Sequence, residues 1–92
     1  MRITYDRAKR AKTLKERGLD FADAKLVFAG RHGVIPDRRQ DYGEPRFLSP
    51  GFLRGRFVVL VWTPRGRARR IISMRYGHAK EARRWQQALE RS

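Results

Sequence analysis

The sequence predicts one α+β domain over residues 1–92, in which helices near both ends of the chain flank an antiparallel sheet of three to four strands. The longest apolar run, Phe57 to Trp62, has the length of a strand. The turn-forming segment Pro64–Gly66 follows and leads into Arg67–Arg75, which favours a hairpin. Hydrophobic residues make up 40% of the chain, which is enough for a globular core.

One short strand and two helices are expected before the sheet. Arg2–Tyr5 has the composition of a strand. Asp6 is a favourable N-cap for a helix that ends near Arg17, and its narrow apolar stripe is Ala8, Ala11 and Leu14. Asp20 caps a second helix that ends at Gly30. The apolar stripe of this second helix consists of Phe21, Ala24, Val27 and Phe28.

The rest of the chain predicts the sheet and a last helix. Phe57–Thr63 is apolar without alternation, so it should be a central strand covered on both faces. A final helix is expected over Ala79–Glu90, with Trp85 on its apolar face. The remaining strands, loop and turn are expected in this order: strand Arg31–Ile35, loop Pro36–Gly43, strand Arg46–Leu48 and turn Pro50–Gly51.

The charge of the chain points to a polyanionic partner. The net charge is +14, from 23 basic and 9 acidic residues. From Arg54 to Arg84 there are ten basic residues against one acidic residue, so the positive field is concentrated in the C-terminal part. Nucleic acid is the first candidate partner and an anionic membrane a weaker one, and an acidic protein partner is compatible with either. A GC-rich genome would also raise the arginine content, so composition alone does not decide between these readings.

Several classes of protein and of site are excluded or disfavoured. The chain has no cysteine, so it has no disulfide and no thiolate metal site. It contains neither a secretory signal nor an apolar run of membrane-spanning length, and a cytoplasmic bacterial-type protein is the default expectation. No His-x-x-His or Glu-x-x-His spacing and no glycine-rich phosphate loop occurs, so we expect no metal and no cofactor.

Three groups of residues carry a family resemblance that covers most of the chain. They are Tyr5-Asp6 with Lys9 and Gly18 near the N-terminus, Glu44-x-Arg46 before Gly51, and Arg70-Ile71-Ile72-Ser73-x-Arg75 with Glu81 and Arg83 downstream. On these motifs the chain resembles the BrnT toxins of bacterial type II toxin–antitoxin pairs, within the wider RelE-like ribonuclease fold. It departs from the family pattern at Tyr5, where a Trp is usual, at Glu16-Arg17 in place of Lys-His, and at Trp85 in place of Tyr.

The resemblance implies a function that composition does not. It implies an endoribonuclease toxin that cleaves RNA and blocks translation. It also implies a BrnA-like antitoxin with a ribbon-helix-helix DNA-binding part, and a toxin–antitoxin complex that represses its own promoter DNA.

The residues of the last two motif groups fit metal-free RNA cleavage. Such an enzyme must hold the phosphate, transfer protons and stabilise the negative charge of the transition state. The planar fork of arginine bridges two phosphate oxygens, and carboxylates are candidate bases. Arg70 has a structural alternative as a solvent-facing or ion-paired residue, and Glu81 has one as a favourable charge in the first turn of a helix. The predicted catalytic residues are Arg46, Arg70, Arg75, Glu44 and Glu81.

A wider basic surface is expected to contact RNA. The segment Arg67–Arg75 carries four arginines, a density that a buried strand does not need. The predicted RNA-binding residues are Arg56, Arg65, Arg67, Arg69, Tyr76, His78, Lys80 and Arg83. A non-catalytic nucleic-acid-binding module and a subunit that docks an acidic protein are the competing interpretations. The carboxylates within the basic surface favour the enzyme, because a pure binder does not need them.

Overall fold

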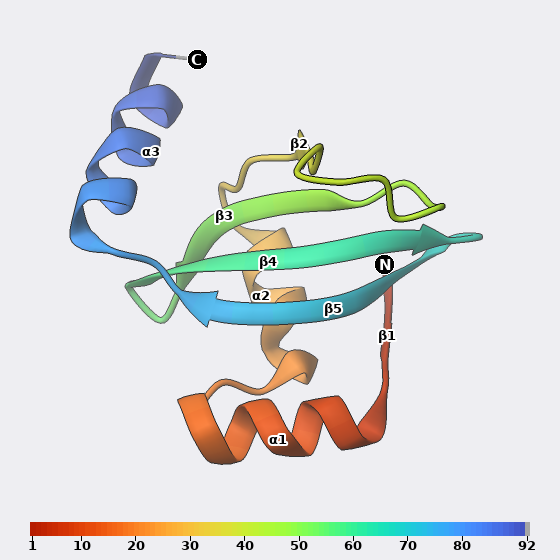
Figure 1. Cartoon of the computed structure of the whole chain (residues 1–92). Helices are drawn as coiled ribbons and strands as arrows, with labels where there is room; N and C mark the ends of the chain where they lie inside the picture. The colour runs from red at the N-terminus through yellow and green to blue at the C-terminus, as the bar shows by residue number, and fades with distance from the viewer. Residues whose placement is uncertain (92) are drawn as a thin grey trace.

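The computed structural model describes residues 1–91 and shows an α+β fold built on one five-stranded sheet (Figure 1). The spatial order of the strands is β1-β5-β4-β3-β2, so β4 lies at the centre. The elements along the chain are β1 (Arg2–Tyr5), α1 (Arg7–Arg17), the 3-10 helix η1 (Phe21–Asp23), α2 (Ala24–Ala29), β2 (Ile35–Pro36), β3 (Phe47–Leu53), β4 (Arg56–Arg65), β5 (Ala68–Tyr76) and α3 (Ala79–Arg91).

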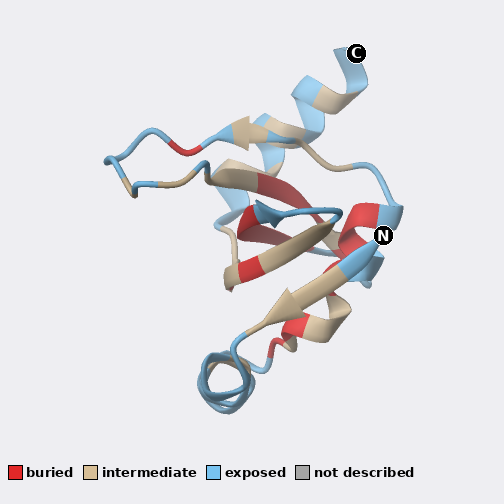
Figure 2. Cartoon of the chain, turned by 90° about the vertical axis from the view of Figure 1, so that its right-hand side faces the viewer, coloured by how far each residue is buried: buried red, intermediate tan, exposed pale blue. Residues whose placement is uncertain are grey.

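The hydrophobic core lies between η1–α2 and one face of the sheet (Figures 1 and 2). The predicted stripe of the second helix supplies one side of it, and all of its members are buried. Central strand β4 is buried from Phe57 to Thr63, which confirms the prediction made from its unbroken apolar run. The core residues of the sheet are Leu53, Val58, Leu60, Trp62, Ile71 and Met74.

The sheet is mixed rather than antiparallel, which corrects the prediction. β1 pairs with β5 in parallel, from Arg2 opposite Ala68 to Tyr5 opposite Ile71. The other neighbouring pairs are antiparallel. The two segments are far apart in the chain and separated by helices, so the direction of their pairing is decided by the tertiary fold and not by a local turn.

The prediction of a turn at Pro50–Gly51 is wrong, because β3 continues through both residues. Pro50 lies opposite Val59 of β4, and its carbonyl accepts a hydrogen bond from the Gly33 N–H at 2.8 Å. The N and the C=O of one strand residue point to the same side, so the missing proline N–H falls away from β4 and no ladder bond to β4 is lost.

The turn between β3 and β4 lies instead at Arg54–Gly55. Both residues have positive φ, 48° and 81°, as a two-residue type I′ hairpin turn requires. A positive φ is uncommon for arginine. The side chain of Arg54 pairs with Asp23 of η1 at 3.3 Å, which connects this turn to the helical layer.

Two further predictions need correction. The helix expected from Asp20 to Gly30 is split into η1 and α2, although Asp20 caps it as expected by accepting from the Ala22 N–H at 2.9 Å. The strand expected at Arg31–Ile35 is reduced to β2 and one isolated bridge between His32 and Gly51. This segment has few apolar residues to bury, so pairing is confined to the points where β3 is within reach.

Helix α1 has the predicted caps but not a buried stripe. Asp6 accepts from the Lys9 N–H at 3.0 Å, and Gly18 ends the helix with a φ of 70°. None of the residues of α1 is buried, and Leu14 is 44% exposed. The helix lies along the sheet edge with a polar side toward β5, as the groove described below shows.

Helix α3 extends from the end of β5 and is mostly exposed (Figures 1 and 2). Its Trp85 packs against Gly33, where an added Cβ would lie 3.0 Å from the ring and 3.2 Å from Pro50. Arg31 also donates a hydrogen bond to the carbonyl of Leu89. Within residues 1–91, no helix combines the length and the apolar character needed to cross a bilayer.

Candidate active site

A β-bulge interrupts the alternation of side chains in β5. The pairing with β4 shifts by one residue between Val61 and Trp62, which leaves Ile72 as the extra residue. Ile71 and Met74 are an odd number of positions apart and would lie on opposite faces of a regular strand. Both are buried in the core, with 1% and 0% of their surface exposed.

The same shift places Arg70 and Arg75 together on the other face. Arg70 lies opposite Thr63 and Arg75 opposite Val59, and these two partners share a face as alternate residues of β4. Ser73 lies between the two arginines on this face. We call this the outer face, with Val59, Thr63, Arg70, Ser73 and Arg75 as its members. Without the bulge the two arginines would be separated by the sheet.

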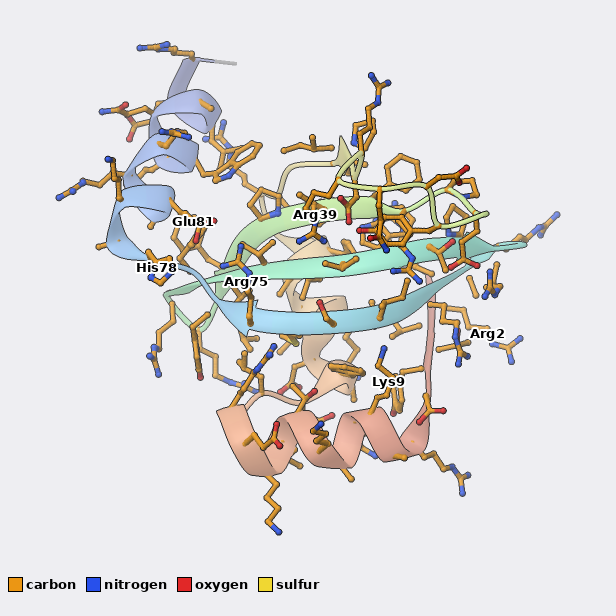
Figure 3. The ribbon with its side chains drawn as sticks, viewed as in Figure 1. Arg2, Lys9, Arg39, Arg75, His78 and Glu81 are labelled. Atoms are coloured by element: carbon orange, nitrogen blue, oxygen red, sulfur yellow. The ribbon has the colours of Figure 1, made fainter. Side chains whose placement is uncertain are left out.

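The outer face is bordered by α1 on one side and by the loop of residues 37–46 on the other (Figures 1 and 2). The hydroxyl of Thr63 donates to the carbonyl of Pro45 at 2.6 Å, which holds the loop at this face. Figure 3 shows Lys9 extending from α1 toward β5. At the end of β5 it shows three neighbouring side chains: Arg75, His78 and Glu81.

Arg75 and Glu81 form a bidentate ion pair where β5 leads into α3. The two Nη atoms of Arg75 donate to the two carboxylate oxygens of Glu81 at 3.0 and 3.1 Å. This fork-to-fork arrangement fixes the plane of the guanidinium. The Arg75 side chain is still 43% exposed, so its remaining edge is accessible from the outer face.

Glu81, the third residue of α3, also helps to cap the N-terminus of this helix. Its Oε1 accepts from the His78 backbone N–H at 3.1 Å, which is the return bond of a capping box. The bond from Arg75, assisted by this backbone bond, lowers the pKa of Glu81 to about 2. The carboxylate is therefore ionised at neutral pH and is a weak proton acceptor, since an effective base has a pKa near the working pH.

Gly77 makes the close junction between β5 and α3 possible. Its N–H donates to the carbonyl of Phe57 at 3.1 Å. A Cβ at this position would overlap the buried Phe57 ring, and it would also lie 3.5 Å from Glu81 Oε1. The absence of a side chain here lets the backbone of the junction lie close to the Phe57 ring.

The second predicted pair, Glu44 and Arg46, is part of the loop structure. The guanidinium of Arg46 lies 4.0 Å from the ring centroid of Tyr42, and its Nε is 3.5 Å from Glu44 Oε2. Glu44 also accepts from Arg65 Nη1 at 3.1 Å. The hydrogen bond from Arg65 is the main cause that lowers the pKa of Glu44. These contacts tie the loop to the end of β4.

The same loop contains a buried carboxylate that the sequence analysis did not single out. Asp37 is 7% exposed and accepts two side-chain bonds from Arg39, at 2.8 and 2.7 Å. The hydrogen bond from Arg39 lowers the pKa of Asp37 to about 2. Its N–H donates to the carbonyl of Arg46 at 2.8 Å. In this border, Asp37 is thus paired with Arg39, and Glu44 is paired with Arg46 and Arg65.

The predicted RNA-binding residues fall into two groups. Some are exposed but have a partner within the protein: Arg65 pairs with Glu44, and Arg56 lies over the ring of Tyr76 at 3.9 Å. The exposed group without a salt bridge among the described residues consists of Arg67, His78, Lys80 and Arg83. Arg67 is at the β4–β5 turn, where Gly66 takes a positive φ of 57°. The exposed group surrounds the two ends of β5.

Arg69 occupies a different environment from the other arginines of β5. Its guanidinium lies 4.5 Å from the ring centroid of Phe28 and 4.4 Å from that of Trp62, on the core face of the sheet. Its Nη1 is buried and has no hydrogen-bond partner within residues 1–91. Burial lowers the pKa of Arg69. Its contacts are those of a residue that covers the aromatic core.

The outer face can hold an anion and stabilise added negative charge. Arg70 and Arg75 present two guanidinium groups from one strand, and Ser73 adds a hydroxyl donor between them. Within the described residues, Arg70 makes no salt bridge. Among these residues there is also no group of three or more metal-ligating side chains.

Sequence reasoning missed the contribution of α1. Lys9, Lys12 and Ser73 line a common groove between α1 and β5. The signal was present in the helical spacing, because Lys9, Lys12, Thr13 and Glu16 share one side of the helix. It was overlooked because the apolar stripe of α1 was the side expected to face the protein.

The chain was also compared with known proteins. No curated protein matches it. A family model described as the ribonuclease toxin BrnT of type II toxin–antitoxin systems matches residues 5–81. This segment runs from the end of β1 to Glu81 in the first turn of α3, so it includes Arg70 and Arg75. Because the match spans most of the chain, the protein belongs to the BrnT family of ribonuclease toxins of type II toxin–antitoxin systems.

Proposed function

We propose that this chain is a metal-independent endoribonuclease whose outer face holds the phosphate of the bond to be cleaved. The observation that carries this proposal is the β-bulge that brings Arg70 and Arg75 to one face. Two guanidinium groups can bridge the non-bridging oxygens of one phosphate and neutralise the charge that builds up during attack. Family membership supports the reaction type.

In the proposed reaction, the ribose 2′-oxygen attacks the adjacent phosphorus and the bond from phosphorus to the 5′-oxygen breaks. The 2′-hydroxyl gives up its proton to a base, and the leaving 5′-oxygen receives a proton from an acid. The products are a 2′,3′-cyclic phosphate and a 5′-hydroxyl. Arg70 and Arg75 bind the phosphate throughout and stabilise the pentacoordinate transition state.

Glu81 and His78, which lie near Arg75 in Figure 3, receive different roles in this proposal. Glu81 is a positioning residue, because a carboxylate with a pKa of about 2 orients the guanidinium better than it accepts a proton. His78, exposed beside the pair, is the candidate for proton transfer, since histidine is the side chain whose charge changes near neutral pH. Glu44 and Arg46 are assigned to holding the loop, because their groups are engaged there.

Family membership supports the biological setting of the proposal. A type II toxin has a protein antitoxin as its partner. We propose that this antitoxin is BrnA-like, with a ribbon-helix-helix part, and that the complex binds its own promoter DNA. We further propose that RNA cleavage inhibits translation and takes place in the cytoplasm. The RelE-like fold and the single-domain organisation stay predictions.

The alternative function is a basic nucleic-acid-binding module without catalysis. The net charge of +14 supports both possibilities equally, because it attracts any nucleic acid. The bidentate pair favours the enzyme, since a binding surface gains affinity from a free arginine and loses some of it to a neighbouring carboxylate.

The deciding experiment is cleavage of a defined single-stranded RNA in the presence of EDTA. The wild type should give fragments with cyclic phosphate and 5′-hydroxyl ends, and Arg70→Ala should not. Arg84→Ala, which removes an exposed arginine from α3, is the matched control and should cleave normally. Loss of cleavage with EDTA would overturn the metal-free mechanism. Salt-sensitive binding without fragments would favour the binding module.

A further inference from the structure

A groove of about 300 Å³ lies between α1 and the edge of β5 that faces this helix. Its lining residues are Lys9, Lys12, Thr13, Glu16 and Arg17 of α1 with Ile72 and Ser73 of β5. None of them belongs to the predicted catalytic or RNA-binding residues. The proposed function described above therefore leaves this groove without a role.

The groove exists because β1 covers only half of the edge of β5. The pairing of β1 ends where Tyr5 lies opposite Ile71, and from Ile72 onward α1 is the neighbour. Arg17 Nη1 donates to the carbonyl of Met74 at 3.0 Å and so holds the helix against this edge. An edge strand presents its backbone N–H groups as well as its carbonyls on the open side. The N–H of Met74 therefore points to the same side as the carbonyl that Arg17 binds.

The side chains of the groove are mainly cationic and hydrogen-bond donating. Lys9, Lys12 and Arg17 outnumber the one carboxylate, Glu16. Neither lysine ammonium takes part in a salt bridge within residues 1–91. The charges of this groove are thus available to an external anion.

The groove opens onto the outer face at a point between Arg70 and Arg75. Ser73 lines the groove and lies on β5 between Arg70 and Arg75. Neighbouring positions on one face of a strand are about 6.6 Å apart. An extended chain of phosphates can therefore pass from the arginines into the groove without leaving the surface of β5.

We propose that this groove binds the sugar–phosphate backbone of single-stranded RNA next to the bond held by Arg70 and Arg75. Lys9 and Lys12 each neutralise one phosphate, and the Ser73 hydroxyl donates a hydrogen bond at the entrance. This inference rests on the proposed ribonuclease function, which places the RNA on the outer face.

The difference between α1 and the loop of residues 37–46, the two borders of the outer face, explains why the RNA backbone extends from the outer face toward α1. On the opposite border, Arg39 is paired with Asp37, and Arg46 is stacked on Tyr42 beside Glu44. A phosphate that binds Arg39 or Arg46 would have to compete with these carboxylates. On the α1 border the lysines are not paired, so contact with phosphate releases counterions without breaking a salt bridge.

The test compares two double variants that remove the same charge. Lys9→Gln/Lys12→Gln changes the groove, and Lys15→Gln/Lys25→Gln changes two exposed lysines outside it. The probe is a uniformly 2′-O-methylated single-stranded RNA, which cannot be cleaved because it has no free 2′-hydroxyl. Its dissociation constant is measured against salt concentration for each protein. All four substitutions are at exposed positions, and thermal unfolding checks that the variants are folded.

We expect the groove variant to bind at least about tenfold more weakly for any RNA sequence. The slope of log affinity against log salt should fall by about 1.4, which is two phosphates at about 0.7 each for single-stranded nucleic acid. The control variant should keep the wild-type slope. Equal losses of RNA affinity in both double variants would overturn the proposal that the groove binds RNA. They would indicate that the positive charge of the whole surface attracts the RNA.

Failure of the groove and failure of the proposed function give different results. If the wild type cleaves unmodified RNA but the groove variant binds the probe as the wild type does, the groove is overturned and the ribonuclease stands. If the wild type never cleaves RNA but the groove variant alone shows the reduced slope, the proposed function fails and the groove is supported. The inference would also be overturned if the groove variant lost its binding to an acidic protein partner while its binding to RNA stayed unchanged.

Discussion

Two glutamate–arginine pairs of similar composition have different surroundings in this molecule. In the loop of residues 37–46, Arg46 is stacked on Tyr42, and Glu44 is shared with Arg65. At the junction of β5 and α3, Glu81 accepts from both Nη atoms of Arg75, Nη1 also donates to the carbonyl of Tyr76 at 3.5 Å, and the side chain is 43% exposed. The comparison teaches that residue type identifies a candidate group, whereas its neighbours decide whether the group is available to a substrate.

The largest expected difference is between Arg75→Ala and Arg46→Ala. Arg75→Ala should lower kcat for RNA cleavage by about 100- to 1,000-fold, the usual loss when one donor to the transition state is removed. Arg46→Ala should cost about 0.5–1 kcal/mol of stability through the lost stacking on Tyr42, with cleavage by the folded protein near that of the wild type. Single-turnover cleavage and thermal unfolding measure the two effects. A catalytic loss in Arg46→Ala equal to that in Arg75→Ala would invalidate the distinction.

The next expected effect is that of Gly77→Ala on the junction itself. The new methyl group overlaps the Phe57 ring, so either the ring or the start of α3 must move. We expect a loss of about 1–3 kcal/mol in the free energy of unfolding, typical of an overpacked site. Cleavage should also decrease, because Glu81 is displaced from Arg75. Gly30→Ala is the control, because Gly30 has a negative φ of −96° and an added Cβ would have its nearest neighbours at 3.9 Å.

Substitution of Glu81 sharpens the comparison through its pH dependence. The pKa of Glu81 is lowered from 4.5 to about 2 in the folded protein. The folded state therefore binds this proton less readily than the unfolded state, and the stabilisation is complete above about pH 4.5. It is lost as the pH falls toward 2.

Glu81→Gln should remove this part of the acid dependence, which urea unfolding at a series of pH values would show. It should also lower kcat by about tenfold with little change in KM, because Arg75 is less well oriented. An unchanged kcat would leave Glu81 only its role as the cap of α3.

The smallest effect is expected for Arg69→Met. The substitution keeps an unbranched side chain over Phe28 and Trp62 and removes a buried N–H that lacks a partner within residues 1–91. We expect a change in stability within about 1 kcal/mol and no change in kcat. A loss of cleavage like that of Arg75→Ala would show that the core face also contributes to the site.

Much of the fold follows from local signals in the sequence. The caps at Asp6, Gly18 and Asp20 are where they were expected, and the apolar run of β4 identifies the centre of the sheet. The continuation of β3 through Pro50 could not be predicted from the sequence. A proline fits within a strand where its nitrogen faces away from the neighbouring strand, and the sequence does not show on which side that strand lies. The parallel pairing of β1 is equally a property of the whole fold.

The site was predicted by residue type and not by arrangement. The arginines of β5 were identified from their density, but strict alternation would have placed Arg70 and Arg75 on opposite faces. The bulge has a faint trace in the sequence, where Ile71, Ile72 and Met74 break the alternation of apolar residues. Whether such a break marks a bulge or a strand end is decided by the neighbouring strand.

A double-mutant cycle on Arg70 and Arg75 tests most directly that both arginines hold one phosphate. Single-turnover cleavage would be measured for the wild type, Arg70→Ala, Arg75→Ala and the double variant. We predict that each single variant is strongly impaired and that the double variant loses less than the product of the two effects, with a coupling of about 0.5–3 kcal/mol. Strictly multiplicative losses, or a single variant that cleaves at the wild-type rate, would contradict the account.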